Sequence, residues 1–290
     1  MKKESKSNPS AQIDSPIELL KQAWEVFAKR YSVFLGIILI PALYLIAGKI
    51  LSVAFIEVLK VNNTEIGFVL ASDFLVILLF LLFFWSQVSL LYAVANEKAG
   101  VDESYQKGKN LLWAYIVLSL FTSLIVFGGV IVFLIPGIIF SVWLSLAVFV
   151  FIKENEKQEK AILKSYEYVR GHWWPILGRI LFITFILVAA QWIISVILSF
   201  CGLQIEDSKE LSGIISYFFY PLSLVYYFAI YQNIKKIKNN LSFSLDKNKK
   251  NLFIVFALIS FLIIMLAVIF LIKYPGAINY LNSPRMGVFN

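Results

Sequence analysis

Few residues of this sequence are of the types that carry out catalysis or bind metals. His172 is the single histidine and Cys201 the single cysteine among 290 residues. A protein zinc site needs three or four Cys, His or carboxylate ligands, and neither residue has such neighbours at ligand spacing. The common hydrolase, metalloprotease and nucleotide-binding motifs are also absent. We therefore expect no metal, no cofactor and no enzymatic activity.

Two glutamines lie within long apolar runs, where their amide groups need hydrogen-bond partners. Gln87 is flanked by Ser86 and Ser89, and Gln191 precedes Trp192. Hydrogen bonds between membrane helices contribute about 1–2 kcal/mol or less, so one interpretation is that both amides join neighbouring helices. The alternative is an intramembrane polar site, at Gln87 and Gln191, for a transported solute or lipid.

Four basic or titratable side chains are candidates for contact with anionic lipid headgroups. They are Lys164, Arg170, His172 and Arg179. The simpler alternative is snorkelling, in which a long cationic side chain lies along hydrocarbon and its charge reaches the headgroups. His172 also stands beside Trp173, an aromatic residue typical of the point where a helix enters a membrane.

The composition indicates the kind of structure that must position these residues. Hydrophobic residues make up 60% of the chain and charged residues 15%, with a mean hydropathy of +0.80. Soluble domains carry about 25% charged residues, and disordered chains are poor in aromatics, whereas this chain is 16% aromatic. The sequence therefore predicts an all-α, polytopic transmembrane helix bundle.

A bilayer core of about 30 Å needs roughly 20 apolar residues per helix, and the apolar runs provide seven such spans. The 42-residue charge-free run is too long for one crossing, so we predict two, with the turn at Gly128–Gly129 or Pro136–Gly137 and Pro136 at the first position of the returning helix. The predicted spans cover residues 31–58, 74–95, two crossings within 111–152, then 176–198, 214–234 and 252–272.

The net charge of +8 is explained by topology rather than by nucleic acid, which we do not expect as a partner. Cytoplasmic loops carry an excess of Lys and Arg. Most of the 26 basic residues fall on one side of the membrane if the N-terminus is inside and the C-terminus outside. The corresponding segments are a disordered tail (1–14), a membrane domain (15–235), a basic cytoplasmic loop (236–251), a seventh transmembrane helix (252–272) and an outside tail (273–290).

Two short stretches before spans are amphipathic, which predicts interfacial helices lying in the headgroup plane on the cytoplasmic side. Residues 15–30 carry an N-terminal capping pattern, Ser15 with Glu18, and Pro16 at the first helical position. Their apolar face is formed by Ile17, Leu20, Trp24, Phe27 and Tyr31. Residues 161–170 have a similar face of Ile162, Tyr166 and Val169. With a fainter copy at 103–120, these suggest three repeats of one interfacial helix and two spans.

One further pattern connects the chain to known proteins. Pro136 and Gly137 open a span, an acidic turn comes after it, and Ser165, Gly171 and Trp173 come next. This order resembles a bacterial integral-membrane family of unknown function, related to the membrane domain of glycerophosphodiester phosphodiesterases. The resemblance covers residues 15–235 and implies a six-span membrane domain in the bacterial cytoplasmic membrane. The phosphodiesterase domain, which needs His and acidic metal ligands, is expected to be absent.

The sequence supports two functional hypotheses. The first is a non-enzymatic integral membrane protein that organises the bilayer, with anionic lipids or a membrane-protein partner as its contacts. The alternative is a transporter of a small solute or lipid with a site between helices. The transporter predicts a water-accessible cavity at Gln87 or Gln191. The first hypothesis predicts that residues 15–30 and 161–170 lie flat on the membrane, and either stretch forming a straight extension of its span would count against it.

Overall fold

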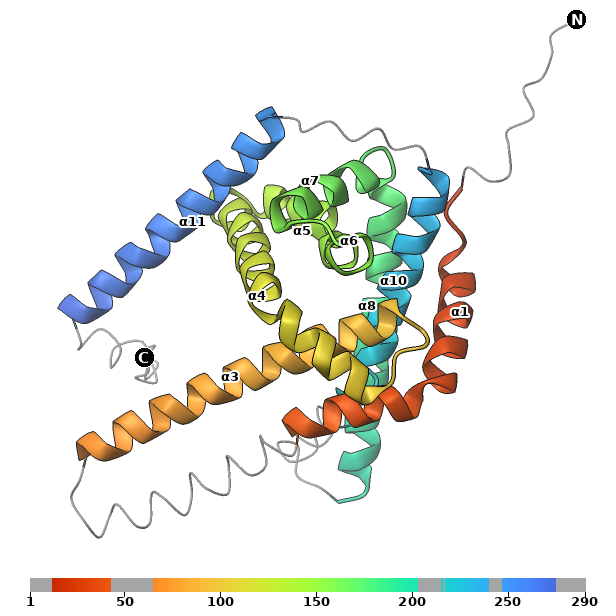
Figure 1. The fold of residues 1–290 in the computed structure, drawn as a ribbon, viewed down its shortest axis with the longest axis horizontal. Coiled ribbons are helices and arrows are strands. Elements are labelled where there is room, and N and C mark those ends of the chain that lie inside the picture. The colour runs from red at the N-terminus through yellow and green to blue at the C-terminus, as the bar shows by residue number, and fades with distance from the viewer. Residues whose placement is uncertain (1–11, 43–64, 203–214, 216, 240–246, 275–290) are drawn as a thin grey trace, which may run out of the picture. The chain divides into compact units, whose positions relative to one another are not determined.

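The computed structural model describes residues 12–42, 65–202, 215, 217–239 and 247–274 (Figure 1). Within these ranges the regular structure is entirely helical and contains no strand. This confirms the predicted all-α class. The chain divides into two compact units, one formed by residues 1–118 and 142–243 and the other by residues 119–141 and 244–290.

The first unit contains most of the helices. They are α1 (Pro16–Lys29), α3 (Glu65–Ala95), the first half of α4 (Val101–Val132), α6 (Ala147–Glu154), α7 (Gln158–Val169), α8 (Trp173–Phe200) and α10 (Tyr220–Ile237). The second unit contains the rest of α4, most of α5 (Leu134–Leu144) and α11 (Lys247–Lys273).

Five helical segments in the described ranges are long and apolar enough to cross a membrane. They are Val76–Ala95, Val101–Val132, Leu134–Glu154, Trp173–Phe200 and Asn248–Lys273. These match five of the seven predicted spans. In the first predicted span, residues 31–42 form a helix, and residues 43–58 lie outside the described part of the chain. Predicted span six coincides with α10, an 18-residue helix that is not among the five.

The turn within the long apolar run lies elsewhere than predicted. Helix α4 continues through Gly128 and Gly129 to Val132, and the break comes at Phe133, so Pro136 is the third residue of α5 rather than the first. The first turn of a helix leaves its N–H groups unbonded, which is why proline fits there. The glycines instead permit close packing, since a Cβ on Gly129 would lie 2.9 Å from the Cα of Gly137.

Within the second unit, helices α4 and α11 approach each other closely at Gly128. A Cβ there would lie 2.2 Å from the carbonyl oxygen of Phe256, and Ser260 Oγ of the same helix donates to the carbonyl of Leu124 at 2.5 Å. We expect Gly128→Ala to force α4 and α11 apart and to cost about 1–3 kcal/mol, measured as a lower thermal unfolding midpoint in detergent.

The matched control for this substitution is Gly178→Ala on α8. Nothing lies within 4 Å of a Cβ at Gly178, and alanine is the better helix former by about 0.5–1 kcal/mol. The control should leave the midpoint unchanged or raise it. Equal midpoints for the two variants would contradict the close contact.

Helix α1 begins and ends as its sequence pattern predicts. Ser15 Oγ accepts the Glu18 N–H at 3.2 Å, and Pro16 is the first helical residue. The helix ends at Lys29, and after Arg30 the chain turns sharply into a second helix, Tyr31–Ala42 (Figure 1). The first amphipathic stretch is therefore separate from the helix after it, as the bilayer-organising hypothesis requires.

Helix α7 is also separate from its span but differs from the prediction in its surroundings. It ends at Val169, and Gly171, with a positive φ of 84°, turns the chain into α8. Its apolar stripe of Ile162, Tyr166 and Val169 is at most 6% exposed, because protein rather than lipid covers it. The third suggested repeat differs too, since α4 runs unbroken from Val101 into its span.

Candidate functional site

A buried carboxylate joins three helices in the first unit. Glu154 ends α6, and its side chain is only 9% exposed. It receives hydrogen bonds from the Tyr231 hydroxyl at 2.6 Å and the Tyr168 hydroxyl at 2.9 Å. It forms ion pairs with Lys235, at 3.0 Å, and with Lys164. We call these five residues the Glu154 network.

The protonation states in the network result from burial and from the carboxylate. Burial and the hydrogen bond to Glu154 raise the pKa of Tyr168 above its usual value. Burial alone would lower the pKa of Lys164, but the carboxylates of Glu154 and Glu156 hold it above the ordinary range. Tyr168 is therefore a neutral donor and Lys164 a cation at neutral pH. A carboxylate accepts about four hydrogen bonds, so the four donors occupy Glu154 fully and it joins helices rather than serving as a base.

This network makes the protein sensitive to alkali. Because the folded-state pKa of Tyr168 and of Lys164 is raised, the stability they contribute is complete below their ordinary pKa values, 10.0 and 10.5, and is lost as the pH rises beyond them. We expect the thermal midpoint to begin to fall above about pH 10, and Tyr168→Phe to reduce that fall. Tyr274→Phe, at a position that is 51% exposed, is the control and should leave the fall nearly unchanged.

Cations also bind the free carbonyl groups at the end of α3. Arg30, 8% exposed, donates to the carbonyls of Ala93 and Ala99, the latter at 2.5 Å. Lys153 donates to the carbonyl of Ala95 at 2.8 Å. The last carbonyls of a helix lack helical partners and carry partial negative charge. These cations therefore fasten α3 to the turn after α1 and to α6.

The start of α1 is fixed by a second set of polar contacts. Arg179 on α8 donates to the carbonyls of Ile13, at 2.7 Å, and Asp14, at 2.9 Å through Nε. Asn233 on α10 exchanges two hydrogen bonds with Asp14, donating to its carboxylate at 2.6 Å and accepting its backbone N–H at 3.2 Å. Helix α1 is thus held to the bundle at both ends.

The four candidate headgroup contacts do not form one cluster. Lys164 lies in the Glu154 network, and Arg179 binds the Asp14 segment. Arg170 is 65% exposed and pairs with Glu167 at 3.7 Å. His172 Nδ1 is buried without a hydrogen-bond partner among the described residues, and burial, with the Lys238 cation nearby, lowers its pKa. The structure thus shows internal partners for Lys164 and Arg179, and headgroup contact stays a prediction.

Of the five residues that carry the family resemblance, four lie at or beside helix ends, and Ser165 lies within α7. Ser165, fully buried, donates to the carbonyl of Trp143 at 2.7 Å, close to where α5 ends. Gly171 ends α7, and Trp173 begins α8 with its ring against that of Trp174 at 4.6 Å. Pro136 and Gly137 lie in the second unit, in the first turn of α5.

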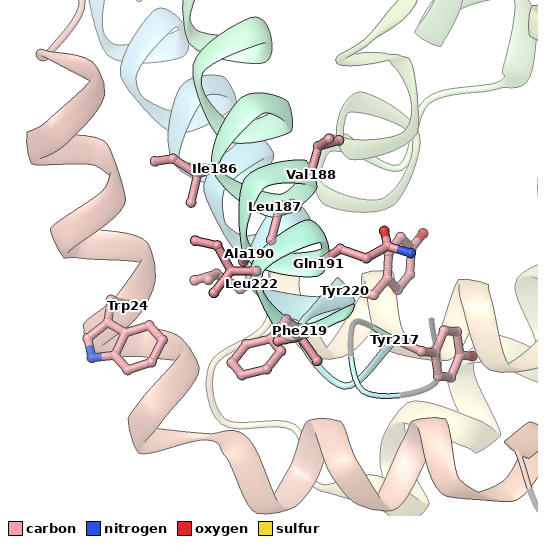
Figure 2. A pocket seen from close by; sticks show the side chains of 12 residues that line it. Trp24, Ile186, Leu187, Val188, Ala190, Gln191, Tyr217, Phe219, Tyr220 and Leu222 are labelled. Atoms are coloured by element: carbon pink, nitrogen blue, oxygen red, sulfur yellow. The ribbon is translucent and has the colours of Figure 1, made fainter. Parts of the chain in front are cut away.

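The two predicted intramembrane glutamines lie in different surroundings. Gln87 is 5% exposed and accepts a hydrogen bond from the Tyr220 hydroxyl at 2.8 Å, so it joins α3 to α10. Gln191 is exposed on α8 and lines an apolar groove of about 610 Å³ (Figure 2). Tyr220 lines the same groove (Figure 2). The helix-joining interpretation fits Gln87, whereas Gln191 lines the groove.

Sequence reasoning missed the Glu154 network. The signal available was a carboxylate standing directly after an apolar run, with Lys164 and Tyr168 further along. Nothing local indicates that Tyr231 and Lys235, almost eighty residues further on, complete it.

The apolar helices, the separate amphipathic helix α1 and the buried polar contacts define a multi-pass, all-α integral membrane protein. Comparison of the chain with protein families, with curated proteins and with solved structures found no match.

Proposed function

We propose that this protein is a non-enzymatic membrane protein that organises the bilayer around it, or a partner protein within it, through the outer surface of α1. The observation that carries the proposal is an exposed apolar stripe on that helix. Ile17 is 59% exposed, Trp24 50% and Tyr31, just beyond the helix, 38%. Large apolar side chains so placed beside membrane-spanning helices suit the boundary between headgroups and hydrocarbon.

The stripe is one of three faces of α1. At about 100° per residue, Leu19, Ala23 and Phe27 form a buried face that packs against α10. The exposed stripe comes next around the helix. The remaining arc carries the exposed polar residues Glu18, Gln22, Glu25 and Lys29. A helix with one face toward protein, one toward hydrocarbon and one toward water is expected only at the membrane surface.

The rigidity of α1 supports the same proposal. Arg179 and Asn233 bind the segment before the helix, and Arg30 binds the end of α3 after it. A helix fixed at both ends presents its apolar stripe at constant depth and orientation. It is thereby suited to order the adjacent lipids or to receive the helix of a partner.

The proposal includes the side of the membrane and the family. The positive-inside distribution favours α1 on the cytoplasmic side of a bacterial cytoplasmic membrane, with the C-terminus outside. The sequence pattern of Ser165, Gly171 and Trp173 favours the family related to the phosphodiesterase membrane domain. Labelling of Cys201, which is exposed, with a membrane-impermeant maleimide tests the orientation: reaction from outside is expected, and reaction only from inside would contradict it.

The depth of the stripe is tested by spin labelling in a Cys201→Ser background. Ile17→Cys and Gln22→Cys place labels on the apolar stripe and on the polar arc of the same helix. In lipid nanodiscs we expect the label at 17 to be relaxed mainly by oxygen and that at 22 mainly by a water-soluble nickel complex. Equal access of the nickel complex to both labels would refute the proposal.

A transporter is the second candidate, and the groove at Gln191 is the observation that favours it. Its lining is almost wholly apolar, which suits a lipid better than a polar solute. Lipid scrambling assayed with a fluorescent phospholipid in proteoliposomes tests it: accelerated scrambling relative to empty vesicles would support transport, and its absence would remove that candidate.

A further inference from the structure

We propose that the helix Tyr31–Ala42, which follows α1, opens and closes as a separate element of the first unit and is held closed by two hydroxyl groups (Figure 1). The hydroxyls belong to Ser86 on α3 and Tyr105 on α4, and both donate to the backbone carbonyl of Ile37. We call this arrangement the Ile37 latch. It goes beyond the proposed function and does not depend on the depth of α1.

Pro41 creates the acceptor of the latch. In an α-helix the carbonyl of residue 37 would accept the N–H of residue 41. Residue 41 is a proline, which has no N–H and whose ring crowds the carbonyl four positions earlier. Ile37 is fully buried, so solvent does not replace the missing donor. Because a buried carbonyl without a donor destabilises a fold, Pro41 requires donors from other helices.

Two hydroxyls supply those donors. The Tyr105 hydroxyl lies 2.7 Å from the carbonyl oxygen of Ile37, and Ser86 Oγ lies 3.2 Å from it. A carbonyl oxygen has two lone pairs, so the two donors complete its hydrogen bonding. Ser86 and Tyr105 lie in segments that are long and apolar enough to cross a membrane, where side chains of neighbouring helices replace the hydrogen bonds lost at a proline. The latch thus joins three helices at one oxygen atom.

The two donors are positioned by contacts that do not involve Ile37. Trp85 Nε1 donates to the carbonyl of Tyr105 at 2.9 Å, and the two rings meet edge to face with their centroids 5.3 Å apart. Nearby, α3 and α4 approach so closely that a Cβ on Gly108 would lie 3.2 Å from the Cα of Ser89. The hydroxyls therefore belong to a tightly packed pair of helices, and they keep their places when Tyr31–Ala42 opens.

The other contacts of helix Tyr31–Ala42 are less directional. Within the described residues, the latch provides its only hydrogen bonds to other helices. Its buried side chains include Phe34 and Ile38, and a Cβ on Gly36 would lie 2.9 Å from Val101 Cγ2. Burial of apolar surface is non-directional. Loss of the latch should therefore leave the helix packed by apolar contacts but let it open more often.

Hydrogen exchange of backbone amides in lipid nanodiscs measures how often the helix opens. The double variant Ser86→Ala/Tyr105→Phe removes both donors, and we expect the amides of residues 31–42 to exchange about tenfold faster. The amides of α10 should exchange at the wild-type rate. Tyr92→Phe is the matched control, because it removes a hydroxyl that joins α3 to α4 through Glu103 at 3.3 Å and takes no part in the latch. It should leave the exchange of residues 31–42 unchanged.

Pro41→Ala separates the latch from ordinary packing. Alanine supplies the N–H that the Ile37 carbonyl lacks, so this carbonyl keeps a donor when the hydroxyls are removed. In the Pro41→Ala background we expect Ser86→Ala/Tyr105→Phe to change the exchange of residues 31–42 by less than about twofold. If the hydroxyls acted only by filling space, the two substitutions would accelerate exchange equally in both backgrounds.

Three results would overturn the inference. The first is unchanged exchange in Ser86→Ala/Tyr105→Phe, and the second is an acceleration that persists in full in the Pro41→Ala background. The third is an equal acceleration in α10, since residues 31–42 would then open only together with the rest of the first unit. If the double variant does not fold, Ser86→Ala alone is measured in the same way, with an expected acceleration of about threefold.

Discussion

Glu154→Gln is expected to destabilise the folded protein more than any other single substitution of an ionisable residue in the first unit. The change removes the carboxylate shared by Lys164 and Lys235 from a side chain that is only 9% exposed. Lys164 keeps Glu156 as a partner, whereas Lys235, 44% exposed, loses its ion pair. The new amide also directs donor hydrogens toward hydroxyls that already donate, those of Tyr168 and Tyr231. Removing one partner of a buried ion pair costs about 3–5 kcal/mol, and we expect a loss of that size.

The thermal unfolding midpoint in detergent measures this loss, and Glu156→Gln is the matched control. Among the described residues Glu156 forms its ion pair with Lys164, at 3.3 Å, and its side chain is 28% exposed. Ion pairs that reach solvent contribute about 0–1 kcal/mol, so the control should unfold close to wild type. If both variants unfold at the same temperature, the carboxylate of Glu154 does not hold the three helices together.

A double-mutant comparison separates the network from general packing. Tyr231→Phe removes the shorter of the two tyrosine hydrogen bonds to Glu154, at 2.6 Å. If the bond is the reason that both single variants lose stability, the double variant should lose less than the sum of the two, because the bond can be lost only once. Strict additivity would show that the two residues act independently.

Local features of the fold were predictable because their causes lie close together in the sequence. Ser15 and Pro16 start α1 through contacts within one helical turn, and Gly171 ends α7 through its own backbone conformation. The five long apolar helices result from composition over about 20 residues each. In each of these cases the structure of a segment is determined by the residues of that segment itself.

Other features were not predictable because they depend on distant parts of the chain. The Glu154 network joins residues 77 positions apart. Gly128 suggested a turn, but it lies within α4, where the close approach of Phe256 explains the absence of a side chain. Periodicity identified the apolar faces of α1 and α7 correctly, yet it cannot distinguish lipid from protein as the neighbour. Phe27 and Tyr166 proved to face protein, whereas Trp24 is exposed.

Arg30→Gln is the second substitution with a large expected effect, because Arg30 is the charged residue that fastens the end of α1 to the end of α3. Its guanidinium binds two backbone carbonyls, those of Ala93 and Ala99, and lies over the ring of Phe34 at 5.3 Å. A hydrogen bond to a charged group contributes about 1.5–3 kcal/mol. Glutamine cannot reach both carbonyls, so we expect a loss of about 3 kcal/mol.

The shape of the guanidinium, and not only its charge, should decide the size of this effect. Arg30→Lys keeps the charge but offers a single ammonium group, which lacks the planar fork that spans two acceptors, so it should recover only part of the lost stability. Lys29→Gln, one position earlier and exposed, should stay within about 0.5 kcal/mol of wild type. Full recovery of stability by Arg30→Lys would mean that a positive charge at the end of α3 is sufficient and that the shape of the guanidinium does not matter.

Arg30 also fixes the position of Tyr31. Arg30→Gln should therefore loosen α1 and increase amide hydrogen exchange along its apolar stripe before the bundle itself unfolds.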